Sequence, residues 1–150
     1  TLEGAAPPPD PGLLAHRVRE LSSGADRLIV EGAGGLLVPL DARRTIADLA
    51  RALALPLLIV APDRLGVLSD VLTCVESATA RGLTVAAVIL SQHQHGPDDP
   101  SRRTNRRILQ RRLPSPVLTF PSCLDDDSAL ADAARHCGLL VALEPSSSAI

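Results

Sequence analysis

The chain has 150 residues, a mass of 15.7 kDa and a formal net charge of −2, and 45% of its residues are hydrophobic against 21% charged. This length suits one domain, and the balance of apolar and charged residues excludes disordered, collagen-like and coiled-coil proteins. No apolar run approaches the roughly 20 residues of a membrane helix, and the proline-rich residues 1–10 do not resemble a signal peptide, so we expect no membrane partner.

The cysteines and the basic residues narrow the chemistry further. Three cysteines, Cys74, Cys123 and Cys137, form an odd set without CxxC spacing, which predicts reduced thiols and a cytoplasmic location. All fifteen basic residues are arginines, so a mechanism that requires a lysine cannot be completed within these residues. The chain has no methionine and opens at Thr1, from which we expect a piece of a longer protein.

Helix and strand signals alternate along the chain. In chain order, we predict a helix over 10–21, a buried strand over 27–31, a helix over 46–53, a strand over 56–61, a helix over about 65–80, a strand over 84–90, a helix over 100–113, a strand over 116–120 and a helix over 127–136. Asp10 and Thr45 are placed to cap the first two helices, and Pro11 suits a first helical turn. Four apolar runs separated by helix-length segments predict a single α/β domain over 1–150, with a parallel sheet and helices on both faces.

In such a sheet, ligands gather at the carboxyl ends of the strands. The predicted strand ends fall at residues 31–35, 62–66, 91–95 and 121–125. Glu31 stands out, because a carboxylate at the end of a buried strand is costly unless it binds a cation or is otherwise paired. The glycines after Glu31 let backbone N–H groups approach an anion. The alternative is a plain strand end followed by a flexible turn, and composition leaves both open.

Residues 30–40, Val-Glu-Gly-Ala-Gly-Gly-Leu-Leu-Val-Pro-Leu, resemble the signature segment of the dethiobiotin synthetase family. Neighbouring segments agree with that family in order and distance, and the resemblance covers most of the chain, most loosely after Gln92. The agreeing segments are residues 2–4, 45–50, 55–60, 64–68, 72–73 and 81–86. The resemblance implies a P-loop NTPase-like fold that works as a homodimer, of which this chain holds the C-terminal two-thirds.

The resemblance also implies an activity. Diaminopelargonate takes up CO2 as a carbamate, ATP phosphorylates the carbamate, and the second amine displaces phosphate to close the ureido ring of dethiobiotin. Mg2+ on the nucleotide neutralises charge at the transferring phosphoryl group. The implied partners are therefore ATP, CO2, diaminopelargonate and a second copy of the chain.

Residue roles are implied position by position. Glu31 would hold Mg2+, and Gly32, Ala33 and Gly34 would line the phosphates. The substrate's carboxylate would lie against Arg64, Gly66, Val67, Leu68 and Ser69, at a helix start. The nucleotide base would lie against Ser91, Gln92, Pro121, Ser122 and Cys123. The family commonly has asparagines where this chain has Ser69 and Ser91, and a serine in place of the second asparagine puts the base preference in doubt.

The largest departure is that no GxxxxGK[ST] phosphate loop occurs among these residues, so we expect the chain alone not to turn over. Three explanations stay open: a fragment of a full enzyme, a partner chain that supplies the loop, or a non-catalytic remnant of the fold. A related P-loop synthetase that amidates a corrin is a further alternative, which the loop at residues 64–69 disfavours.

Other features favour ordinary structural roles. The arginines of residues 102–112 predict a solvated helix face, because the overall charge is slightly negative and Phe120 is the only aromatic residue, so we expect no nucleic-acid partner. His93 and His95 favour a flexible polar loop over a zinc site. Residues 125–127, three aspartates, are typical of a helix cap, and Cys74 of a helical core face.

Overall fold

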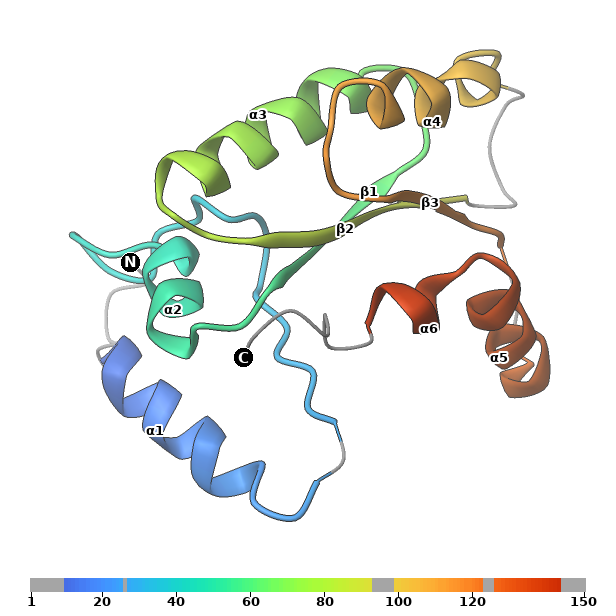
Figure 1. The fold of residues 1–150 in the computed structure, drawn as a ribbon. Coiled ribbons are helices and arrows are strands. Elements are labelled where there is room, and N and C mark those ends of the chain that lie inside the picture. Colours follow the sequence, from blue (N-terminus) through green and yellow to red (C-terminus); the bar gives the residue numbers. More distant parts are fainter. Residues whose placement is uncertain (1–9, 26, 93–98, 123–125, 144–150) are drawn as a thin grey trace. The chain divides into compact units, whose positions relative to one another are not determined.

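The structure is a computed structural model that describes residues 10–25, 27–92, 99–122 and 126–143. Its elements, in chain order, are α1 (Pro11–Leu21), α2 (Ile46–Leu53), β1 (Leu57–Pro62), α3 (Val67–Ala80), β2 (Val85–Ser91), α4 (Arg102–Gln110), β3 (Val117–Phe120), α5 (Asp127–His136) and α6 (Leu139–Ala142) (Figure 1). The chain divides into two compact units, residues 1–56 with 78–84 and residues 57–77 with 85–150. No helix of the described residues is long and apolar enough to cross a membrane.

The first unit contains α1 and α2, which contact each other, and the buried residues of these two helices include Ala15, Ala47 and Ala50. Both helices begin where the sequence predicts. The Asp10 carboxylate accepts the N–H of Gly12 at 2.8 Å and so caps α1. The start of α2 is held by Asp48, the third residue of the helix. Its carboxylate accepts hydrogen bonds from the backbone N–H and the hydroxyl of Thr45, the residue that precedes the helix.

The predicted strand over 27–31 is wrong. These residues form no strand, and Leu28, Ile29 and Val30 are exposed, Ile29 to 80%. A strand is stabilised by a hydrogen-bonded neighbour, and in the described part of the chain no strand pairs with this segment. The sheet therefore has three strands rather than the four expected.

The second unit contains this sheet, whose strands are parallel and lie in the order β1-β2-β3. Leu58 to Pro62 of β1 pair in register with Ala87 to Ser91 of β2, and β2 pairs in turn with β3. The central strand β2 is buried over residues 87–90, and such an uninterrupted apolar run is typical of a strand covered on both faces.

One face of the sheet packs on α3 and α4, and α5 and α6 lie on the other side of it (Figure 1). The core on the first face consists of Ala61, Val67, Val71, Val88, Leu90, Leu109 and Val117. The short helix α6 was not predicted; it follows Gly138, whose φ of +83° suits glycine. The α/β class with a parallel sheet and helices on both faces is confirmed.

The arginine-rich helix α4 is only partly a solvated face. Arg102 is half-buried and donates from Nε to the carbonyl oxygen of Asp63 at 2.7 Å. Arg106 donates in the same way to the carbonyl oxygen of Val117 at 2.9 Å. The solvated-face prediction is confirmed for the exposed side chains of Arg103, Arg107, Arg111 and Arg112. Two arginines of one helix thus bind backbone at β3 and just after β1.

Other predictions met different outcomes. Asp126 caps α5 by accepting the N–H of Ser128 at 2.8 Å, which confirms the capping interpretation of this acidic segment. Cys74 is half-buried, and among the described residues Cys74 and Cys137 are free thiols. The predictions on His93 and His95 lie outside the described residues.

Candidate functional site

The glycine-rich segment after Glu31 lies in the first unit, and packing restrains two of its glycines. A Cβ added to Gly32 would lie 3.0 Å from Cγ2 of Ile46. Gly34 has a φ of +82°, and a Cβ there would lie 2.8 Å from Cγ2 of Val38. The fold itself therefore requires glycine at Gly34, whatever ligand the segment binds, whereas a Cβ at Gly32 would press on the Ile46 side chain.

Glu31 is the predicted metal ligand, and its side chain is exposed at the start of this segment. Across residues 10–25, 27–92, 99–122 and 126–143, no three or more His, Cys, Asp or Glu side chains group so as to hold a metal ion. Mg2+ is usually held by one or two carboxylates together with substrate phosphates and water. Glu31 therefore fits one ligand of a nucleotide-bound Mg2+, and the described residues do not form a complete metal site around it.

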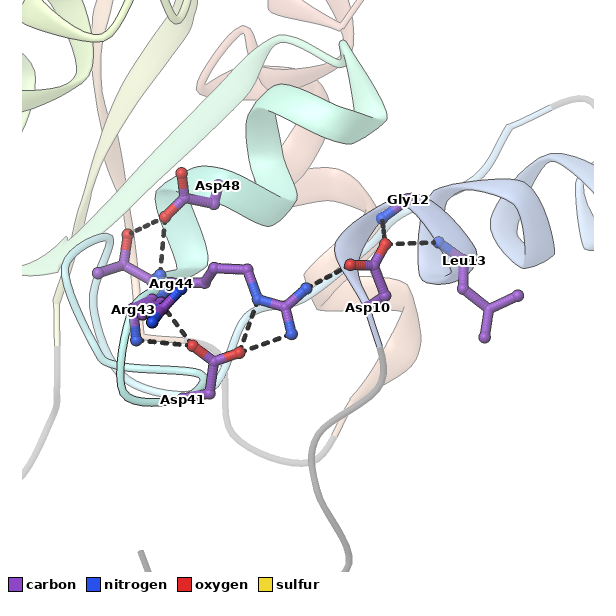
Figure 2. Close-up of polar contacts among 8 residues, drawn as sticks. Asp10, Gly12, Leu13, Asp41, Arg43, Arg44 and Asp48 are labelled. Carbon is purple, nitrogen blue, oxygen red and sulfur yellow. Dashed lines mark hydrogen bonds and ion pairs between the residues drawn. The ribbon is translucent and has the colours of Figure 1, made fainter.

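A tight turn over residues 39–45 follows the glycine-rich segment and is held by hydrogen bonds and ion pairs of Asp41 and Arg44 (Figure 2). One oxygen of the Asp41 carboxylate accepts the backbone N–H groups of Arg43 and Arg44, each at 2.8 Å. The other oxygen accepts Nε of Arg44 at 2.6 Å, and the Arg44 guanidinium also pairs with Asp10, the cap of α1. Arg44 thus ties the turn to the start of α1.

The pKa values of these groups follow from the same contacts. The N–H of Arg43, followed by the Arg44 side chain, holds the pKa of Asp41 below its usual value. The pKa of Asp10 is likewise lowered, chiefly by the helix N–H that it caps. The hydrogen bond that Arg44 donates to the Asp41 carboxylate raises the pKa of Arg44. Both carboxylates are therefore ionised at neutral pH, and the cluster is a stabilising feature of the turn.

The other predicted binding residues belong to the second unit and follow the three strands. Ser91 is the last residue of β2 and pairs with Pro62 of β1 and Phe120 of β3. The N–H of Gln92 donates to the carbonyl oxygen of Phe120 at 2.9 Å. The sheet therefore brings its three strand ends together, and the predicted residues at these ends are Arg64, Gly66, Ser91, Gln92, Pro121 and Ser122. Cys123 lies outside the described residues.

The loop after β1 leads directly into α3. Its Arg64 is exposed and pairs with Asp70 at 3.0 Å, and Gly66 has a φ of +93°. The side chain of Val67 is fully buried in the core, so only its backbone can face a ligand. Ser69 is exposed, and its N–H donates to the carbonyl oxygen of Gly66 at 3.1 Å. A ligand at this loop would therefore meet Arg64, Ser69 and backbone groups.

Sequence reasoning missed the burial of two polar residues, Asp63 at the start of this loop and Asn105 on α4, each 2% exposed. Nδ2 of Asn105 donates to Oδ1 of Asp63 at 2.8 Å. A sequence signal was available, because Asn105 lies one helical turn before the buried Leu109 and so shares its inward face. A polar residue on such a face indicates a buried hydrogen bond.

Comparisons with known proteins give the family. The family model described as AAA domain (AAA_26) matches residues 12–127. An ATP-dependent dethiobiotin synthetase BioD from Saccharopolyspora erythraea is 39% identical over 140 residues, which cover 92% of this chain and 62% of the relative. The proteins of the same name from Anaeromyxobacter dehalogenans and Aromatoleum aromaticum are 48% identical over 99 residues and 41% identical over 112 residues. These matches cover 65% and 73% of this chain but 44% and 48% of the relatives.

The chain thus spans about half the length of the curated relatives that it matches. The matched family, the parallel sheet with its covering helices and the identities of 39–48% agree with one another. The chain therefore belongs to the AAA domain family, and it is similar over 92% of its length to a protein named ATP-dependent dethiobiotin synthetase BioD.

Proposed function

We propose that the protein carrying this chain is an ATP-dependent dethiobiotin synthetase, which closes the ureido ring from diaminopelargonate and CO2. The observation that carries the proposal is the similarity to a relative of that name over 92% of the chain. The edge of the sheet where three strand ends meet supports it, because open α/β sheets bind ligands at this edge.

The nucleotide binds two sets of residues in this proposal. Gly32, Ala33 and Gly34 present backbone N–H groups to the phosphates. The base lies against Ser91, Gln92, Pro121, Ser122 and Cys123. The registers that place Ser91 beside Pro62 and Phe120 support a shared surface for the second set.

The substrate's carboxylate binds the loop formed by Arg64, Gly66, Val67, Leu68 and Ser69. An exposed guanidinium at the start of the 14-residue helix α3 supports this role, because the helix dipole and the arginine both favour an anion. The Arg64 ion pair with Asp70 orients the side chain from within the same segment.

Glu31 holds Mg2+ on the nucleotide phosphates, and the bound ion supplies charge neutralisation at the transferring phosphoryl group. An exposed carboxylate followed by glycines supports this role. We further propose that the protein acts as a homodimer in the cytoplasm; the free thiols of Cys74 and Cys137 fit a reducing compartment.

The test is dethiobiotin formation by the full-length protein from diaminopelargonate, bicarbonate and Mg-ATP. We expect product in the wild type and a loss of about 100-fold in kcat for Glu31→Gln, because a metal ligand is removed. Glu76→Gln, which changes an exposed glutamate on α3, is the matched control and should keep wild-type kinetics. A wild type that binds Mg-ATP but forms no dethiobiotin would refute the proposal and favour another synthetase of the same fold.

A further inference from the structure

A buried pair of polar side chains lies beneath the loop after β1. The Asp63 carboxylate and the Asn105 amide are both 2% exposed and are joined by the 2.8 Å hydrogen bond described above. Nε2 of Gln92 donates to the second oxygen of the Asp63 carboxylate at 3.4 Å. The pair therefore connects β1, the end of β2 and helix α4 within one unit.

The contacts around this pair are directed at the backbone of the loop. Nδ2 of Asn105 also lies 3.4 Å from the carbonyl oxygen of Arg64. Arg102 binds the carbonyl oxygen of Asp63, and the N–H of Leu65 donates to the Asp99 carboxylate at 2.5 Å. Three consecutive loop residues are thus held by side chains from α4 and from the segment that precedes it.

Stability alone does not explain why two polar side chains are buried here. Burying a carboxylate and an amide costs free energy unless both are hydrogen-bonded, and an apolar pair of similar size would commonly serve the core as well. The bonds of Asp63 and Asn105 instead set the course of the chain just before Arg64 and Gly66. The hydrogen bonds of Asp63 and Asn105 therefore hold the loop after β1 in one conformation.

We infer that Asn105, acting through Asp63, is a positioning residue that holds the loop at residues 63–66 in the geometry that receives the substrate's carboxylate. This inference rests on the proposed function, which assigns that loop to diaminopelargonate. The pair touches no reacting atom in this account, and its effect is on substrate affinity. A fixed loop avoids the entropy cost of ordering Arg64 when the carboxylate binds.

The test is steady-state kinetics of the full-length protein, with thermal unfolding measured on the same samples. Asn105→Ala should raise the KM for diaminopelargonate about tenfold, which corresponds to about 1.4 kcal/mol or one buried hydrogen bond. The kcat and the KM for ATP should stay within about twofold. Arg106→Gln removes a bond from the same helix to β3 instead of the loop, and Leu109→Val weakens the core beside it. Both control variants should keep the wild-type KM for diaminopelargonate.

A reciprocal exchange supplies a second measurement if Asn105→Ala does not fold. Asn105→Asp alone places two carboxylates in contact and should raise the KM more than Asn105→Ala. The double variant Asp63→Asn with Asn105→Asp restores one amide and one carboxylate, and it should recover part of the lost affinity.

The outcomes separate the two proposals. If the wild type forms dethiobiotin and Asn105→Ala raises both KM values alike, or lowers only kcat, the positioning role is overturned. A change in Arg106→Gln as large as that in Asn105→Ala, or an exchange that recovers nothing, overturns it as well. A wild type that forms no dethiobiotin overturns the proposed function and this inference with it.

Discussion

Substituting Gly34 by alanine tests whether the fold itself requires the glycines of the signature segment. The backbone φ of +82° at Gly34 costs a residue with a Cβ about 1–2 kcal/mol. The new Cβ would also lie 2.8 Å from Cγ2 of Val38, and overpacking of this kind costs about 1–3 kcal/mol. Gly34→Ala should therefore lower the free energy of unfolding by about 2–5 kcal/mol.

The adjacent Gly35 provides a matched control, because its φ is not positive and a Cβ there meets nothing within 4 Å. Gly35→Ala should leave the free energy of unfolding unchanged or raise it by up to about 1 kcal/mol. Urea unfolding followed by circular dichroism measures both variants, with an unchanged denaturant slope as the check. The double variant Gly34→Ala with Val38→Ala removes the clash. Compared with Val38→Ala alone, it should be less stable only by the φ cost of about 1–2 kcal/mol. Equal stability of Gly34→Ala and Gly35→Ala would refute the reasoning.

Two further predictions concern titratable groups. Backbone N–H donors lower the pKa values of Asp10, Asp41 and Asp48 in the folded state. The folded state therefore binds fewer protons than the unfolded state, and the resulting stability is fully present above about pH 4. This stability is lost as the pH falls through the folded-state pKa values. The urea concentration at the unfolding midpoint should therefore decrease as the pH is lowered below about 4. The decrease should be less steep in Arg44→Gln, and an equal pH dependence of the midpoint in the two proteins would contradict this. Burial raises the pKa of the Cys74 thiol, so alkylation of Cys74 at pH 8 should be slower in the folded than in the urea-unfolded protein, and equal rates would count against it.

Local signals account for most of what the sequence predicted correctly. The starts of α1 and α5 depend on Asp10 and Asp126, each of which caps N–H groups two residues ahead. The strands of the sheet are apolar runs that also pair with a neighbour. Residues 28–30 are equally apolar, but a strand also needs a second segment to pair with, and a single apolar run does not reveal whether it has one.

In the candidate site, too, the sequence predicted what depends on chain order and missed a contact between distant residues. Chain order alone predicted that residues after β1, β2 and β3 would meet, because parallel strands end at one edge. The contact between Asp63 and Asn105 spans 42 positions, and no local pattern links the two. Asn105 shares the inward face of its helix with Leu109, which indicates that its side chain is buried, but its pairing with Asp63 depends on the packing of α4 against the sheet.

The two guanidinium contacts of α4 have a consequence for folding. Arg102 and Arg106 are four residues apart, one turn of a helix, and they hold backbone just after β1 and at the start of β3, the two outer strands. Both contacts form together only when α4 is helical and both outer strands flank β2. Docking of α4 therefore couples helix formation to the pairing of both outer strands with β2.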